Sequence, residues 1–149
     1  MNVPIQIKGM RDQWVVPVVS TAGSAGFDLY AAEDVVLEPM QPTLIPLGFG
    51  TVMDESFHAR IEARSGMALK GVVVLTGVID SDYRGEWQVI AMYTGPAPSN
   101  RYQDRFKIVA GERVAQAVLR PTLKPFFEVV EELPDSGRGA GGFGSTGQR

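Results

Sequence analysis

Proline and glycine are spread along the whole chain, and this spacing constrains the fold more than any other feature. The ten prolines leave one long proline-free stretch, residues 47–95, and seven glycines interrupt it. Both residues are unfavourable inside helices, glycine by about 1 kcal/mol and proline by about 3 kcal/mol relative to alanine. The pattern therefore excludes an all-helical bundle or a coiled coil and favours short strands joined by tight turns.

Short runs of alternating or β-branched apolar residues recur between these turn residues. They predict strands over residues 3–7, 14–19, 27–31, 35–37, 43–47, 49–53, 59–62, 71–75, 86–93, 106–109, 113–119 and 126–131. Many short strands at this spacing are typical of a sandwich or a barrel. One segment, 65–70 (SGMALK), has the composition of a single helical turn or two, with Ser65 as its expected N-cap. The polar segment 94–105 is expected to be a surface loop.

The composition changes near the C-terminus. The last fifteen residues, DSGRGAGGFGSTGQR, contain six glycines and one large apolar residue, Phe143. Such a segment buries too little apolar surface to fold by itself. We therefore expect a folded β domain, a sandwich or a barrel, over residues 1–134 and a mobile glycine-rich arm over residues 135–149.

The residues of this arm allow two interpretations. It could be a floppy tail, or a flap that closes over an anion. Arg138, Ser145 and Thr146 carry donors for a phosphate, and Phe143 offers a face for stacking. Glycine amides can also wrap an anion, because their backbone approaches it closely.

Several classes of protein are disfavoured by single residue types. The absence of cysteine excludes disulfides and thiolate metal sites, and the single histidine, His58, excludes histidine-rich metal centres. The net charge of −3 argues against a general nucleic-acid-binding protein, which would normally be basic. No signal peptide or long apolar run is visible, so we expect a soluble cytoplasmic protein with no membrane partner.

Two segments in the first half of the chain place charged residues among turn glycines. In residues 25–34 (AGFDLYAAED), alternation would put Asp28 on the face opposite its apolar neighbours, as in a surface strand. In residues 62–69 (EARSGMAL), Arg64 and Ser65 precede the predicted helical turn. A helix start with an arginine and a hydroxyl is either an anion site or a simple cap.

Two later segments also combine polar and apolar residues. Gln116 lies inside an apolar strand, so its amide must bond a neighbouring backbone or reach a ligand. Residues 77–86 (GVIDSDYRGE) fit a β-hairpin with polar groups at its tip. Asp80 follows two apolar residues there, so it could be held partly desolvated and act as a base.

Taken in order, AGFDLYAAED, RSGMA, GVIDSDYRGE, ERVAQAV and RGAGGFGSTG resemble the five motifs of the trimeric deoxyuridine triphosphate nucleotidohydrolases, or dUTPases. The resemblance runs from residue 25 to residue 147, and the third and fifth motifs are the most specific. The departures are few and remove no residue that the chemistry needs. They are Phe27 for a more usual Tyr, Ala63 for Pro, Met67 for Leu and Glu112 for Asp.

The resemblance implies an all-β protomer, a distorted β-barrel or jelly roll with one short helix. It implies a homotrimer that hydrolyses dUTP to dUMP and pyrophosphate, which lowers dUTP and supplies dUMP for thymidylate synthesis. Water would attack the α-phosphorus, and Mg²⁺ would be held mainly through the phosphates and waters, with Asp28 in indirect support. Each site would collect motifs from several subunits, and the arm over residues 135–149 would close over a neighbour's site.

The resemblance also implies roles for single residues. Asp80 would orient and deprotonate the attacking water, and Tyr83 would lie against the deoxyribose and exclude a 2′-hydroxyl. The backbone of Gly77, Val78 and Ile79 would pair with the uracil. The other substrate contacts would come from Arg64, Ser65, Gly66, Gln116, Arg138, Phe143, Gly144, Ser145 and Thr146, with Phe143 stacked on the uracil.

Two alternatives stay open on the residues alone. One is a dCTP deaminase of the same fold, which would need a different base-binding hairpin. The other is a trimer that serves as a regulatory protein-binding module, with loop 94–105 as its docking surface. Asp80, Arg64 and Gln116 argue against a pure loss of catalysis, but a protein partner in addition to catalysis stays open.

Overall fold

The computed structural model describes residues 3–95, 105–137 and 139–140. In this part of the chain it contains eleven strands and one short helix, which confirms the predicted all-β class. In chain order the elements are β1 (Gln6–Gly9), β2 (Phe27–Tyr30), β3 (Val35–Leu37), β4 (Thr43–Pro46), β5 (Phe49–Val52), β6 (Phe57–Glu62), α1 (Ser65–Leu69), β7 (Val72–Thr76), β8 (Val78–Ile79), β9 (Gln88–Tyr93), β10 (Phe106–Ile108) and β11 (Arg113–Pro121).

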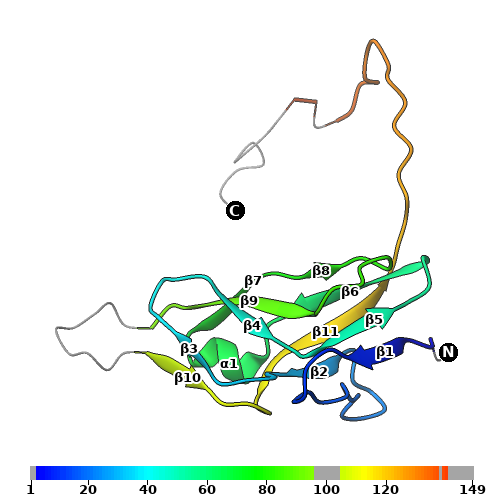
Figure 1. Cartoon of the computed structure of the whole chain (residues 1–149). Coiled ribbons are helices and arrows are strands. Elements are labelled where there is room, and N and C mark those ends of the chain that lie inside the picture. The colour runs from blue at the N-terminus through cyan, green and yellow to red at the C-terminus, as the bar shows by residue number, and fades with distance from the viewer. Residues whose placement is uncertain (1–2, 96–104, 138, 141–149) are drawn as a thin grey trace.

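The strands form four small antiparallel sheets that close into a distorted β-barrel (Figure 1). The largest sheet has the order β2-β11-β6-β8, and a second sheet has the order β4-β9-β7. Two strand pairs, β1-β5 and β10-β3, complete the body. Turn residues interrupt the chain, so every strand except the nine-residue β11 has six residues or fewer, and the barrel is built mostly from brief pairings.

An aromatic cluster fills the middle of the barrel. Trp87 is 1% exposed, and its ring centroid lies 5.3 Å from that of Phe49. The indole Nε1 donates a hydrogen bond of 3.1 Å to the hydroxyl of Thr51, so the polar atom of this buried ring is satisfied. Truncating such a buried ring to alanine typically costs about 3–5 kcal/mol, which makes this cluster a main source of stability.

Most predicted strands are present, with ends that differ by up to three residues, but two predictions are wrong. Residues 14–19 form no strand, and Val18 makes only an isolated bridge to Asp28. Residues 126–131 form no strand either, and Phe126, for example, is 91% exposed. Both segments are apolar and extended, but neither lies beside a strand of the same chain along its length.

The chain leaves the barrel after β11. Residues 122–137 run away from the sheets as an extended segment, drawn in orange in Figure 1. Leu123, Phe127 and Val129 on this segment are at least 85% exposed. An apolar run that no described part of the chain covers is a strong indication of a contact with another molecule.

The polar segment after β7 does not form the predicted tight hairpin. Strands β7 and β9 are antiparallel partners, but β8 lies between them in the sequence and pairs with β6 in the other sheet. Residues 80–87 therefore cross from one sheet to the other. The helix prediction also needs a correction, because α1 begins at Ser65, and Arg64 is its N-cap with no side-chain capping bond.

Candidate active site

A hollow of about 490 Å³ lies where β2, β11 and the start of α1 meet. Strand β11 runs between β2 and β6, so Gln116 is opposite Asp28 on one side and Glu62 on the other. Arg64 is the second residue after β6 and is the N-cap of α1. The lining residues are Ser20, Asp28, Ala63, Arg64, Ser65, Gly66, Ala68, Arg113 and Gln116.

Asp28 is the buried charge of this hollow. It is 9% exposed, so the interpretation as a surface-strand residue is wrong. Its Oδ1 lies 2.9 Å from Arg64 Nε, and its Oδ2 lies 3.3 Å from a terminal nitrogen of Arg113. The hydroxyl of Ser20 also donates to Oδ2 at 3.0 Å. Asp28 therefore holds two guanidinium groups at the wall of the hollow.

Arg113 and Ser20 belong to this cluster but were not predicted from the sequence. Arg113 stands at the start of β11, within the fourth motif, and its positive charge next to apolar residues was an available signal. Ser20 precedes the first motif in an irregular segment. Nothing in the local sequence of Ser20 indicates its contact with Asp28.

Gln116 bonds to backbone, the first of the two predicted options. Its Nε2 donates to the carbonyl oxygen of Ala63 at 3.1 Å. A guanidinium nitrogen of Arg64 donates to the carbonyl of Arg113 at 3.2 Å. These two contacts tie the turn before α1 to β11 and fix the position of Arg64.

The first turn of α1 faces the same hollow. The helix starts at Ser65, and the first amides of a helix have no intrahelical acceptor. A Cβ added at Gly66 would meet no heavy atom within 4 Å, so the space above the turn is open. Backbone donors, a hydroxyl and two arginines thus surround a hollow of a size that suits an anionic group.

Asp80 lies elsewhere on the protomer. It lines a separate hollow of about 530 Å³, together with Val78 and Lys124 among others. Its side chain is exposed in the single chain, so the expected partial desolvation is absent there. His58 lines the same hollow and bonds Thr122 Oγ1 through Nδ1 at 3.0 Å, a contact between β6 and the residue after β11.

The residues expected at the uracil and sugar lie close to Asp80 in sequence but differ in exposure. Ile79 is buried, whereas Val78 is 55% exposed. Gly77 is closely packed, because a Cβ there would lie 2.5 Å from Ile61 Cβ. Tyr83 is 43% exposed, and its hydroxyl donates to the carbonyl of Glu86 at 3.1 Å.

The structure thus groups part of the predicted site and separates the rest. Arg64, Ser65, Gly66 and Gln116 share one hollow, with Asp28 beneath them. Asp80 and Val78 line another. The predicted arm residues Arg138, Phe143, Gly144, Ser145 and Thr146 lie outside the described residues, as does most of loop 94–105.

The sequence model of the dUTPase family matches residues 12–147, which is nearly the whole chain. The chain belongs to the dUTPase family. This confirms the resemblance of the five motifs, and with it the assignment as an enzyme that hydrolyses dUTP.

Curated relatives match over the full length. The deoxyuridine 5′-triphosphate nucleotidohydrolase of Nautilia profundicola is 41% identical over 147 residues, which cover 97% of this chain and 99% of the relative. The corresponding protein of Pseudomonas fluorescens is 46% identical over 142 residues, covering 91% and 89%.

Solved structures agree on the fold. The Staphylococcus bacteriophage 80α dUTPase with dUpNHpp superposes with a TM-score of 0.87 at 28% identity, covering 97% of this chain and 99% of that one. The distorted barrel described above is therefore the dUTPase fold. In the described residues no helix is both long enough and apolar enough to span a membrane.

Proposed function

We infer that this chain hydrolyses dUTP to dUMP and pyrophosphate, and we propose that its active sites are built between the subunits of a homotrimer. The proposal of a shared site is supported by the separation of the predicted site residues on one protomer. The hollow with Arg64 and Gln116 and the hollow with Asp80 are distinct on one protomer. A second copy would bring the Asp80 hollow of one chain to the Arg64 hollow of another.

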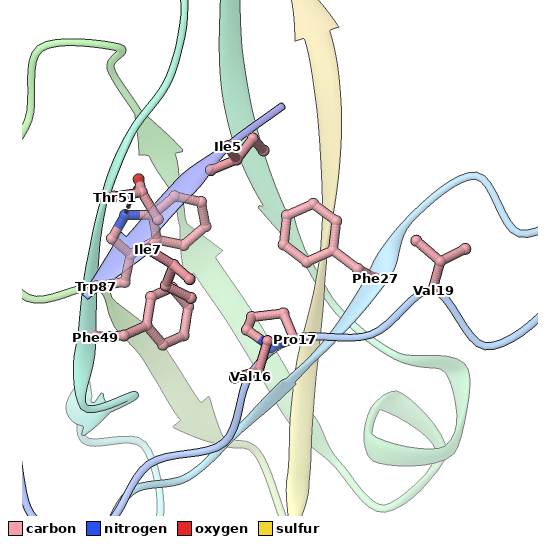
Figure 2. Close-up of a pocket in the computed structure, with 9 residues that line it drawn as sticks. All are labelled: Ile5, Ile7, Val16, Pro17, Val19, Phe27, Phe49, Thr51 and Trp87. Carbon is pink, nitrogen blue, oxygen red and sulfur yellow. Dashed lines mark hydrogen bonds between the residues drawn. The ribbon is translucent and has the colours of Figure 1, made fainter. Parts of the chain in front are cut away.

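Two surfaces of the protomer support an assembly. The segment after β11 exposes Phe126 and Phe127 at 91% and 85%. On the barrel, aliphatic and aromatic side chains gather around a hollow of about 180 Å³ (Figure 2). Ile5, Ile7 and Phe27 line this hollow together with Trp87. We propose that such apolar surfaces are buried between subunits, because water-exposed apolar area of this kind favours association.

In the proposed site the phosphates occupy the hollow at the start of α1. Arg64 neutralises phosphate charge, and Asp28 and the Arg113 carbonyl hold its guanidinium in place. The Ser65 hydroxyl and the amides of Ser65 and Gly66 donate to phosphate oxygens. These donors are fixed before the substrate arrives, and such preorganised donors stabilise the charge that develops in a transition state.

The groups expected from other parts of the trimer complete the chemistry. The carboxylate of Asp80 accepts the proton of the water that attacks the α-phosphorus, and Arg138 contacts the phosphates, as does Gln116 from the Arg64 hollow itself. Ser145, Thr146 and the Gly144 amide donate to the γ-phosphate when the arm closes. Expelling water from the closed site strengthens each of these contacts.

We propose that Mg²⁺ is the cofactor, held mainly through the substrate phosphates. In the described part of the chain no three histidine, aspartate or glutamate side chains cluster to hold a metal. Magnesium usually keeps several waters and takes few carboxylates plus phosphate oxygens, so phosphates and waters would supply most of its ligands here, while Asp28, whose two oxygens contact Arg64 and Arg113, would support the ion only indirectly. When bound there, the ion supplies charge neutralisation to the triphosphate. A dUTPase of the S. aureus phage φ11 coordinates a structural Mg(II) ion.

Selection of the base and sugar is assigned to the segment from Gly77 to Tyr83. The backbone from Gly77 to Ile79 pairs with the uracil edge, and Phe143 stacks on the ring. Tyr83 lies against C2′ of the deoxyribose, so the ribose of UTP would meet both a steric clash and an unsatisfied hydroxyl. A polar group left without a partner is rejected more strongly than a missing methylene.

We also propose how the chain is divided into domains and where in the cell it lies. We propose a barrel domain over residues 1–134 with an arm over residues 135–149, and a location in the cytoplasm, where nucleotide pools are made. A regulatory protein partner stays a prediction. Phage dUTPases, represented by that of phage 80α, control the transfer of virulence genes.

The proposed function is tested by one pair of variants. Asp80→Asn should lower pyrophosphate release from dUTP by about 10²-fold or more, the scale of a lost general base, and should keep binding of a non-hydrolysable dUTP analogue. Asp82→Asn is the matched control, since it removes a carboxylate from the same hollow. Near-normal turnover of the Asp80 variant would remove Asp80 from the mechanism. Release of ammonia from dCTP by the unmodified enzyme would favour the deaminase alternative.

A further inference from the structure

The segment that carries Tyr83 has little support of its own. It joins β8 in one sheet to β9 in another, and within the described residues its backbone bonds to the rest of the barrel only at its last residue, Trp87. Its internal contacts are short-range: the amide of Tyr83 donates to the carbonyl of Asp80 at 3.1 Å, and Arg84 donates to the carbonyl of Ser81 at 2.7 Å. A loop with only such contacts needs an anchor on the barrel if one of its side chains is to form a rigid wall.

Glu86 provides that anchor. Its Oε1 accepts a hydrogen bond of 2.6 Å from Arg11 Nε and one of 2.9 Å from the backbone amide of Gly48. The Glu86 side chain is only 20% exposed. The hydrogen bond to Glu86 raises the pKa of Arg11 above its ordinary value. Arg11 is held from its other end by Glu33 at 2.6 Å.

On the barrel, the residues that hold the Glu86 side chain are closely packed. Gly48 has a φ of 76°, and a Cβ there would lie 2.7 Å from Trp14 Cβ. Its carbonyl accepts a hydrogen bond of 2.7 Å from the amide of Met10, the residue before Arg11. Both donors to Glu86 thus come from one tightly packed place, so they fix the carboxylate firmly.

Tyr83 is attached to this anchored residue. Its hydroxyl donates to the Glu86 carbonyl, and its ring covers Gly85, where a Cβ would lie 2.5 Å from Tyr83 Cζ. The next residue, Trp87, is buried, and its amide donates to Phe49 at 2.8 Å. The Glu86 carbonyl and the Trp87 amide belong to one peptide group, so the position of the Tyr83 ring depends on how the Trp87 amide and the Glu86 side chain together fix that group.

We propose that Arg11 and Glu86 are positioning residues for sugar discrimination: the Arg11–Glu86–Gly48 contact sets the Tyr83 ring and thereby the preference for dUTP over UTP. This rests on the proposed function, which assigns the sugar wall to Tyr83. Neither charged side chain needs to touch the substrate. Their loss loosens the wall, so it should lower the preference for the deoxy sugar more than it lowers the chemical step.

The test measures kcat and KM for dUTP and for UTP in Arg11→Met and Glu86→Gln. The dUTP-to-UTP ratio of kcat/KM should fall by about 5-fold or more, because small displacements of a positioning group are costly in rate. Most of the change should lie in KM. The ratio comes from a single preparation, so a lower folded fraction reduces both activities equally and leaves it unchanged. Arg11→Lys keeps a charged donor and should recover part of the preference.

Two variants are matched controls. Glu33→Gln removes the outer contact of Arg11 but leaves Arg11 bound to Glu86. Arg105→Gln breaks the ion pair with Glu38, 3.0 Å long, beside the β3–β10 pair. Both should keep a ratio within about two-fold of the unmodified enzyme.

Tyr83→Ala tests the sugar wall separately from its positioning by Arg11 and Glu86. If it lowers the ratio and the Arg11 and Glu86 variants do not, positioning by the anchor is wrong and the sugar wall stands. If Tyr83→Ala leaves the ratio unchanged, the wall itself is wrong, and the inference falls with it.

Discussion

Replacing Asp28 by asparagine removes the charge that holds two arginines while preserving the shape of the side chain. The carboxylate is 9% exposed and contacts Arg64 Nε at 2.9 Å and Arg113 at 3.3 Å. In Asp28→Asn the two guanidinium groups would keep their mutual repulsion but lose the negative charge between them. We therefore expect Arg64 to leave its position at the phosphate hollow for part of the time.

The size of the effect follows from the two contacts. A hydrogen bond to a charged group contributes about 1.5–3 kcal/mol, and the Arg64 contact is of this kind because the Arg64 side chain is 27% exposed. The Arg113 side chain is 52% exposed, so its ion pair adds about 0–1 kcal/mol. The free energy of unfolding should fall by about 1.5–4 kcal/mol in total.

The activity should fall through kcat rather than through KM. A displaced phosphate donor should lower kcat by about 10- to 100-fold, near the lower end for a lost preorganised donor. KM for dUTP should not rise, because a negative charge next to the triphosphate has been removed. Steady-state pyrophosphate release at several dUTP concentrations separates the two constants, and thermal unfolding gives the change in stability.

An Asp→Asn change elsewhere, which alters the net charge by the same amount, is the control for this experiment. Asp34→Asn removes an exposed carboxylate that pairs with Lys107 at 3.6 Å, away from the hollow. Its kcat should stay within about two-fold of the unmodified enzyme. A kcat for Asp28→Asn that matches this control would refute the role of Asp28 in holding Arg64, as would a rise in KM with unchanged kcat.

Three further predictions concern the arm, the assembly and pH. Deleting residues 137–149 should abolish most turnover and leave the trimer intact by light scattering. Mixing the truncated chain with the Asp80→Asn chain should restore part of the activity. If activity is not restored after subunit exchange has been demonstrated, the sites are not shared between subunits. Phe126→Ser combined with Phe127→Ser should shift the trimer towards monomer in sedimentation, whereas Lys124→Ser should not. The hydrogen bond from the Ala110 amide lowers the pKa of Asp34 in the folded protein. The stabilisation that the ionised Asp34 gives to the fold is therefore complete above about pH 4 and is lost as the pH falls through the lowered pKa. Asp34→Asn should show a smaller drop in melting temperature between neutral and acidic pH than the unmodified protein.

Local sequence patterns were sufficient for the class of fold and for most of its strands. Proline and glycine mark the turns between strands, and alternation marks which side chains face the core. Strand β11, for example, was predicted at residues 113–119 and observed at Arg113–Pro121. These features are local because a turn depends on the φ of one or two residues and burial depends on the pattern along a single strand.

The two wrong strand predictions show what a local sequence pattern cannot determine. Residues 14–19 and 126–131 have strand composition, but a strand exists only where another strand donates and accepts its hydrogen bonds. Val18 finds one such partner, at Asp28, and the segment around Phe126 leaves the barrel altogether. Composition indicates that a segment can pair, but it does not tell with which partner.

The same distinction between local pattern and tertiary contact applies to the candidate site. The order of the five motifs identified the family and the residue types of its chemistry, since those depend on sequence alone. That Asp28 holds Arg64 and Arg113, and that Glu86 joins Arg11 and Gly48, became evident only from the folded chain. These partners are tens of residues apart, and only the closed barrel brings them within hydrogen-bonding distance, because contact between distant residues depends on how the sheets pack and not on their neighbours in sequence.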